Sequence, residues 1–200
     1  MGQHGGHIKF IKPTHFKSKY SKWRTQGIVV TFNGIIEQSI PSFKNKTGNI
    51  GLLILDRIED PQNMGQIIRT AECAGIEGII IPKHESCGVT DTVIQVSQGA
   101  FTQMPIYEVN NLHQTITNLK SEDFWVIAME NSLKAKEWHK IDYSGKVVII
   151  VGSEGRGIKN ILLEKSDFKA TIPMEGKTNS LNVSAAVSAV TFERLRQISS

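Results

Sequence analysis

Hydrophobic and polar positions change in short blocks from residue 50 onward, and these blocks predict the elements of a fold. Residues 50–55 and 146–151 are almost continuous apolar runs, which is typical of strands buried on both faces of a sheet. Shorter apolar runs predict further strands at 78–81, 124–129 and 170–172. Helices are predicted at 64–74, 111–120, 158–165 and 182–197.

The order of these elements indicates the fold class. Strands that alternate with helices favour an α/β fold with a mainly parallel sheet flanked by helices. Residues 37–49 read as a linker that ends in a turn-like sequence, and residues 1–27 read as a flexible arm. A short strand is predicted at 27–32. We therefore expect a basic arm and linker over residues 1–49 and a folded domain over residues 50–200.

Composition narrows the class of protein. The chain has 200 residues, 40% of them hydrophobic, which is enough for one globular core. No run approaches the roughly 20 apolar residues of a membrane helix, so we expect no membrane association. Cys73 and Cys87 form no C-x-x-C pair, which favours a reducing compartment, here the cytoplasm. His84 and Cys87 are too few ligands for a metal site, so we expect no metal.

Charge is concentrated at the N-terminus. The net charge is +4, yet residues 1–36 contain no Asp or Glu, while all 19 acidic residues follow. A basic segment of this kind suits the phosphate backbone of RNA. The alternatives are a solvated terminus and a transit peptide, and the single arginine and missing h-region disfavour the latter. The candidate RNA-binding residues are Lys9, Lys12, Lys17, Lys19, Lys22 and Arg24.

Candidate chemistry begins directly after the first predicted strand, in residues 60–69. The carboxyl edge of a parallel sheet is where α/β proteins place ligands. Asn63 and Arg69 lie six residues apart, about 240° around one ideal helix. Arg69 stands among apolar residues, where an arginine needs a partner. A structural salt bridge with Asp56 or Glu72 is therefore the alternative to a functional role.

A second segment, residues 152–157, places three glycines between a buried strand and a helix. Glycine lets the backbone approach a ligand closely, and free N–H groups there can bind it. The spacing G-x-x-G-x-G differs from the dinucleotide-binding G-x-G-x-x-G, which disfavours a dinucleotide-dependent oxidoreductase. A tight structural turn is the alternative reading.

A third segment, residues 172–184, breaks at Pro173 and leads into the last helix. Ser180 and Asn182 are natural N-cap residues, which is the structural alternative to a role in chemistry. Asn179 adds a further polar side chain, so the segment carries more polar groups than one cap needs. The small residues that follow predict close helix packing, either within the chain or in a dimer.

Together, the three segments resemble the signature motifs of the SpoU RNA methyltransferases, which belong to the knotted SPOUT class. Residues 60–69 match D-P-x-N-x-G-x-x-x-R, residues 152–157 match G-x-E-G-x-G, and residues 172–184 match I-P-M-x-G-x-x-x-S-L-N-V-S. The resemblance covers roughly residues 50–196. Residues 96–112 are similar to the branch that methylates a guanosine ribose in bacterial 23S ribosomal RNA, although the tRNA guanosine branch shares all three motifs.

The resemblance implies an activity and an assembly. It implies methyl transfer from S-adenosylmethionine to the ribose 2′-hydroxyl of a guanosine in structured RNA, with S-adenosylhomocysteine as the product. The expected RNA is 23S ribosomal RNA, and tRNA is the alternative. The fold would end in a trefoil knot, and the enzyme would be a cytoplasmic homodimer with its active site at the interface of the C-terminal helices. Residues 1–49 are shorter than the RNA-recognition domain of many relatives, so we interpret them as its remnant or partial replacement.

The resemblance also implies roles for individual residues. The family's catalytic positions correspond to Asn63, Arg69, Glu154, Ser180 and Asn182. Cofactor-binding positions correspond to Gly152, Ile172, Leu181, Met129, Gly157 and Met174, and the strand end at 124–130 would close over the adenosine. Because a guanidinium holds its proton firmly, we interpret Arg69 as an anchor for RNA phosphate and a stabiliser of the oxyanion.

Two other functions remain as alternatives. A knotted methyltransferase that targets a base nitrogen is expected to differ in the third motif. A non-catalytic RNA-binding or assembly protein could keep the fold, although the complete set of five catalytic positions disfavours it.

Overall fold

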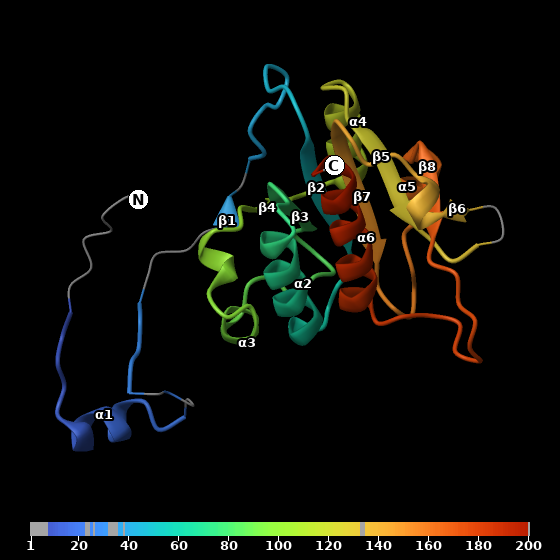
Figure 1. Ribbon diagram of the computed structural model, residues 1–200. Helices are drawn as coiled ribbons and strands as arrows, with labels where there is room; N and C mark the ends of the chain where they lie inside the picture. The colour runs from blue at the N-terminus through green and yellow to red at the C-terminus, as the bar shows by residue number, and fades with distance from the viewer. Residues whose placement is uncertain are drawn as a thin grey trace. The chain divides into compact units, whose positions relative to one another are not determined.

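The computed structural model describes residues 8–22, 25, 27–31, 36–37, 39–132 and 135–199. The chain divides into two compact units, residues 1–34 and residues 35–200 (Figure 1). Within the described part, no helix is long and apolar enough to cross a membrane.

The smaller unit contains one helix, α1 (Pro13–Lys19). Pro13 sits in the first turn, where a missing N–H costs nothing. The rings of Phe16 and Tyr20, one turn apart, lie 4.9 Å from centroid to centroid. The sequence pattern predicted no helix at these residues, and the flexible arm stays a prediction. The predicted strand at 27–32 is wrong over its described residues 27–31, which have no strand partner and leave Ile28 and Val30 74% exposed.

The larger unit is built on an eight-stranded sheet in the order β1-β4-β3-β2-β7-β5-β8-β6. Every strand pairing is parallel. The predicted fold class, α/β with a mainly parallel sheet, is confirmed. The strands are β1 (Ile36–Glu37), β2 (Ile50–Asp56), β3 (Gly78–Pro82), β4 (Ile106–Val109), β5 (Trp125–Met129), β6 (Lys136–Glu137), β7 (Lys146–Gly152) and β8 (Phe168–Thr171).

Helices cover both faces of this sheet (Figure 1). Successive side chains of a strand point to opposite faces, so Leu53 and Leu55 join one apolar cluster and Leu52 and Ile54 join the other. The first cluster lies under α2 (Pro61–Cys73), α3 (Asp91–Val96) and α6 (Val183–Ile198). The second lies under α4 (Leu112–Lys120) and α5 (Asn160–Lys165). Strands β2 and β7 are buried on both sides, as their apolar runs predict.

The segment before β2 packs on the sheet unit. Phe43 is 2% exposed, and its ring meets Phe124 edge-on at 5.6 Å. Glu122 accepts a hydrogen bond of 2.9 Å from the hydroxyl of Ser42. The unit boundary therefore precedes residues 39–49, which the sequence pattern had joined to the arm as a linker.

The strand order places a site at one edge of the sheet. Strand β2 is paired in parallel with β3 on one side and with β7 on the other, with Asp56 opposite Gly152 at their carboxyl ends. The order of the strands reverses here, and such a point is where open α/β sheets bind ligands. The first two motifs leave the sheet at these two strand ends, and the third follows β8. The trefoil knot stays a prediction.

A carboxylate near the end of α6 makes the stability of the fold depend on pH. The guanidinium of Arg196 donates to Glu193 at 2.7 and 2.9 Å, and Gln197 donates at 2.8 Å. Hydrogen bonding to Arg196 lowers the pKa of Glu193 to about 2. The stabilisation by this group is therefore complete above its ordinary pKa of 4.5 and lost as the pH falls from there to about 2.

We expect Glu193→Gln to lower the free energy of unfolding at pH 7, and the difference from the wild-type chain to shrink as the pH falls through this range. Urea unfolding at pH 7 and at pH 3 measures this. Glu72→Gln, an exposed carboxyl on α2, serves as the control and is expected to change little at either pH. A deficit in Glu193→Gln that is the same at both pH values would contradict the assignment.

Candidate active site

A strained residue joins the first two motif loops. Arg57 directly follows β2 and has a φ of 63°, a left-handed conformation that costs a non-glycine residue about 1–3 kcal/mol. This conformation is compensated by a 3.1 Å hydrogen bond from the guanidinium of Arg57 to the carbonyl of Gly157. The buried carboxylate of Asp56 accepts a 2.7 Å bond from the backbone N–H of Lys159. The loops that follow β2 and β7 are therefore tied together.

The start of α2 positions Asn63. Asp60 is the N-cap, and its carboxylate accepts from the N–H of Gln62 at 2.9 Å. Pro61 occupies the first turn, where its fixed φ suits the helix. The helix thus begins earlier than residue 64, where the apolar pattern predicted its start, and Asn63 lies in the first turn.

Three of the predicted catalytic residues meet in one hydrogen-bond network. The side-chain amide of Asn182 donates to Glu154 at 2.7 Å and to Asn63 at 2.8 Å. Glu154 also accepts from the N–H of Val183 at 3.3 Å and from the amide of Asn63 at 3.5 Å. One residue from each motif contributes, so the network connects the ends of three different segments of the fold.

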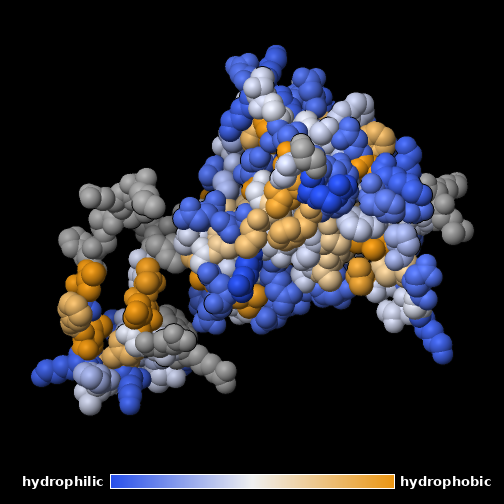
Figure 2. All heavy atoms as spheres, viewed as in Figure 1, coloured by the Kyte–Doolittle hydropathy of each residue, from blue (hydrophilic) through white to orange (hydrophobic). Residues whose placement is uncertain are grey.

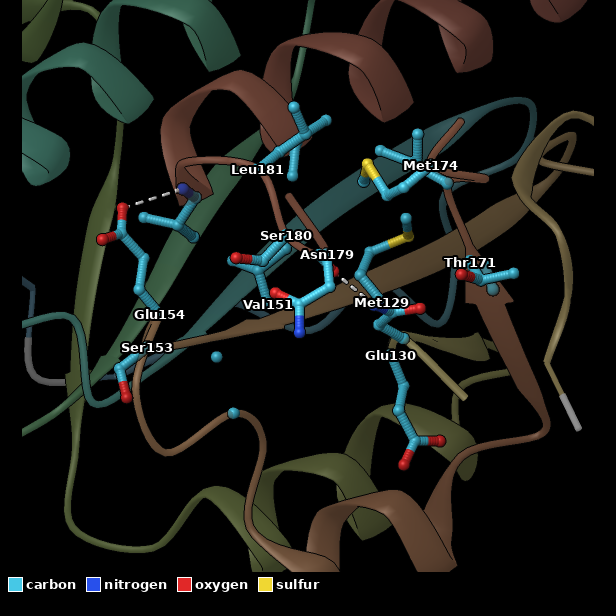
Figure 3. Close-up of a pocket in the computed structure, with 17 residues that line it drawn as sticks. Met129, Glu130, Val151, Ser153, Glu154, Thr171, Met174, Asn179, Ser180 and Leu181 are labelled. Atoms are coloured by element: carbon cyan, nitrogen blue, oxygen red, sulfur yellow. Dashed lines mark hydrogen bonds between the residues drawn. The ribbon is translucent and has the colours of Figure 1, made fainter. Parts of the chain in front are cut away.

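A cavity of about 170 Å³ adjoins this network (Figure 3). Glu154 and Ser180 are among its lining residues. All six predicted cofactor-binding residues also line it: Met129, Gly152, Gly157, Ile172, Met174 and Leu181. The three segments that the sequence analysis singled out therefore converge on one cavity, together with the end of β5.

The lining fits a ligand that combines an aromatic base with polar groups. Met129, Met174 and Leu181 provide apolar surface along the same side of the cavity (Figure 3). The backbone N–H groups of Ile172 and Leu181 bond to no residue that the structure describes. Polar backbone groups near a cavity need partners, so these two N–H groups are available to a nucleobase. The residues present therefore fit S-adenosylmethionine.

Gly152 explains the close approach of the loop that follows β7. A Cβ atom on Gly152 would lie 2.2 Å from the carbonyl carbon of Gly157, so no side chain fits there. Ser153 and Gly157 form an isolated bridge that closes this loop. The glycines of the second motif thus form a tight turn, which was the alternative reading, and the same turn forms a wall of the cavity.

Arg69 lies apart from the network. It is exposed on α2 and forms no ion pair with any described residue. It lines neither this cavity nor a second one beside it, which is bordered by Asn63 and Glu154. The alternative of a salt bridge with Asp56 or Glu72 is therefore wrong, and Asp56 is instead 3.5 Å from Arg57. The six-residue offset from Asn63 turns Arg69 to a different side of the same helix.

The candidate RNA-binding lysines of the arm are exposed: Lys9, Lys12, Lys17, Lys19 and Lys22. Arg24 lies outside the described residues. Among described residues, no group of three or more His, Cys, Asp or Glu could hold a metal ion.

Sequence reasoning missed three residues that shape the site. Arg57 holds the second loop, Gln66 accepts a 2.7 Å bond from Ser184, and Asn131 donates to the carbonyl of Asn179 at 2.5 Å. Arg57 and Asn131 each follow within two residues of a predicted strand. The rule that ligands gather at carboxyl strand ends would have identified both.

Comparison with known proteins agrees with this geometry. The sequence model described as the SpoU rRNA Methylase family matches residues 51–192. A Staphylococcus aureus protein named as a TrmH family tRNA/rRNA methyltransferase is 40% identical over 161 residues, which are 80% of this chain and 64% of that protein. This chain thus spans less than two thirds of that relative.

Two solved structures are similar in fold. The AdoMet-bound rRNA methyltransferase of Sinorhizobium meliloti has a TM-score of 0.70 and 30% identity, and the match covers 81% of this chain and 62% of that one. A structure described as an RNA 2′-O ribose methyltransferase has a TM-score of 0.68 and 26% identity, and covers 80% of this chain and 59% of that one.

Proposed function

We propose that this chain, which belongs to the SpoU rRNA methylase family, transfers a methyl group from S-adenosylmethionine to a ribose 2′-hydroxyl in RNA. The main support for this proposal is the network of Asn63, Glu154 and Asn182, which adjoins a cavity that fits the cofactor. The similar structures with bound AdoMet and with ribose specificity support the same reaction.

We propose a guanosine in 23S ribosomal RNA as the target, with a tRNA guanosine as the alternative. The similarity of residues 96–112 to the ribosomal branch supports the first, and the relative's name includes both RNA classes. A non-catalytic RNA-binding role is disfavoured by the hydrogen bonds among Asn63, Glu154 and Asn182, because packing alone does not need them.

The cofactor would lie against Met129, Met174 and Leu181, with the N–H groups of Ile172 and Leu181 on its polar edge. When bound, it supplies an activated methyl group. An ionised Glu154 can only accept hydrogen bonds, so it fixes the orientation of the Asn182 amide, which donates in turn to Asn63. The second N–H of the Asn63 amide would then hold the ribose. Holding the two reactants in line accounts for much of such a rate enhancement.

The proton of the 2′-hydroxyl must leave as the new bond forms. We propose that Arg69, which is exposed and lies apart from the network of its own chain, acts at the interface of the homodimer proposed below. There it would bind the neighbouring RNA phosphate and stabilise the developing oxyanion, while phosphate or water takes the proton. Ser180 lines the cavity, and we propose that it contacts the reacting groups.

We further propose a cytoplasmic homodimer that meets at α6. Apolar side chains gather on the viewed face of the larger unit over α2 and α6 (Figure 2). Phe192 on α6 is 47% exposed and Leu181, just before it, is 41% exposed. A second chain that packs on this apolar surface would shield the surface from water and would lie close to the cavity.

Labelled methyl transfer from S-adenosylmethionine to unmodified 23S ribosomal RNA, and separately to unmodified tRNA, tests the proposal. Nuclease mapping of the product identifies the methylated nucleotide. We expect 2′-O-methylguanosine in one of the two RNAs. Methylation of a base nitrogen, or cofactor binding without transfer to either RNA, would contradict the proposed activity.

The arm is expected to contribute salt-dependent RNA affinity. Each phosphate contact on single-stranded RNA contributes about 0.7 to the slope of log K against log salt. Replacing the five described arm lysines with glutamine should reduce that slope by about three to four. Equilibrium binding at several salt concentrations measures it. Glutamine at Lys44 and Lys46 of the larger unit is the control, and an equal reduction per charge there would contradict a special role for the arm.

A further inference from the structure

A second cavity borders the network of Asn63, Glu154 and Asn182. It has a volume of about 240 Å³ and shares Ser153, Glu154 and Val183 with the cofactor cavity. Asn63 also lines it. Because the two cavities share Glu154, a nucleotide in the second cavity would lie beside both the network and the cofactor cavity.

An arginine–carboxylate pair lines this cavity. The guanidinium of Arg156 donates to Glu59 at 2.6 Å, and the two side chains are 53% and 54% exposed. Only one carboxylate oxygen of Glu59 is engaged, and only one oxygen of Asp60 is used in capping α2. Within the described residues, the remaining oxygen of each accepts no hydrogen bond.

The charges of the cavity disfavour a phosphate as its ligand. Three carboxylates line it, from Glu59, Asp60 and Glu154, and two guanidinium groups. Arg57 is already held by Asp56 and by the carbonyl of Gly157. The three carboxylates outnumber the one guanidinium that is not already held, so an added anion would be repelled. A neutral base with several N–H donors would instead find carboxylate oxygens that are free to accept.

Among the four RNA bases, guanine matches this arrangement. Its edge presents two adjacent donors, N2–H and N1–H, followed by the acceptors O6 and N7, and arginine is the residue most often paired with O6 and N7. Bases in RNA are read on these edges when they are splayed out of a helix. We propose that Glu59 and Arg156 select guanine, with Glu59 accepting from the base and Arg156 donating to it. This inference rests on the proposed function, since it assigns the base attached to the methylated ribose.

The test measures binding, without methyl transfer. Five-residue RNAs with a central guanosine, inosine or adenosine are titrated by calorimetry into the chain saturated with S-adenosylhomocysteine. We expect the guanosine RNA to bind about tenfold or more tighter than the adenosine RNA, and inosine, which lacks the amino group, to fall between. In Glu59→Gln, which exchanges an exposed carboxylate for its amide, the preference should fall to within about threefold.

Glu85→Gln is the matched control. Glu85 pairs with Lys159 and lies 4.0 Å from Arg156, so it belongs to the same charged cluster, but it does not line the cavity. This variant should keep the preference for guanosine. The inference would be overturned if all three RNAs bound with equal affinity, or if none of them bound. It would also be overturned if Glu59→Gln kept the full preference for guanosine.

The methyl-transfer assay separates this inference from the proposed function. A preference for guanosine that depends on Glu59, in a chain that methylates neither RNA, would keep the recognition site and reject the activity. Transfer that is measurable, with unchanged base preference in Glu59→Gln, would keep the activity and reject the recognition site.

Discussion

Replacing Gly152 with alanine is expected to destabilise the fold by about 3 kcal/mol or more. The added Cβ would lie 2.2–2.5 Å from three backbone atoms of Gly157 and Ile158, and a backbone cannot move aside as the end of a flexible side chain can. Relief of the clash would have to open the loop after β7, which forms one wall of the cavity. We therefore expect loss of cofactor binding together with the loss of stability, measured by calorimetry and by urea unfolding.

The same loop offers a matched control. A Cβ on Gly155 would meet nothing within 4 Å, and Gly155 does not have a left-handed φ. Gly155→Ala is therefore expected to change the free energy of unfolding by less than about 0.5 kcal/mol. Similar losses in the two variants would mean that the loop is sensitive to any substitution, and that close approach at Gly152 is not the cause.

The second large effect is expected from Arg69→Ala, which should slow methyl transfer by about a hundredfold or more and leave cofactor binding intact. A guanidinium that stabilises a developing negative charge typically contributes about a hundredfold to a thousandfold in rate. Because Arg69 is exposed and lines neither cavity, its removal should leave the affinity for S-adenosylmethionine and the free energy of unfolding almost unchanged. Single-turnover transfer and cofactor titration measure the two properties separately.

Two further variants define the role of Arg69. Arg69→Lys keeps the charge and loses the planar fork that pairs with phosphate, so we expect it to recover only part of the activity. Glu72→Ala, three residues along the same helix and also exposed, controls for changes to α2 itself. Loss of cofactor binding in Arg69→Ala would contradict its assignment to the RNA side of the reaction.

The elements that the sequence pattern predicted well are those whose burial is set by their own residues. Strands β2 and β7 are apolar except at one end, Asp56 in β2 and Lys146 in β7, and stand within one residue of their predicted bounds. Strands β1 and β6 have two residues each and exist only through pairing with β4 and β8. Strand β4 and helix α3 are also short and were not predicted, because a polar residue, Glu108 in β4 and Gln95 in α3, interrupts the apolar residues of each.

The candidate site was predictable as a set of residues, but its internal contacts were not. The motifs indicate that Asn63, Glu154 and Asn182 act together, whereas their mutual hydrogen bonds depend on how three strand ends meet. Arg69 shows the limit most clearly: its apolar neighbours suggested a buried, paired arginine, and the turn of α2 instead directs it to solvent. Such an outcome depends on which side of the helix faces the sheet.

The network at the cavity joins segments that are distant along the chain. Asn63 is separated from Glu154 by 91 positions and from Asn182 by 119. Contacts of such high sequence separation form late, because closing long loops carries an entropic cost before any contact is gained. No fragment that lacks either α2, with Asn63, or the N-cap of α6, Asn182, contains the whole network. Cofactor affinity should therefore appear only in the last step of folding, and added cofactor should protect the entire larger unit from unfolding, not only the cavity.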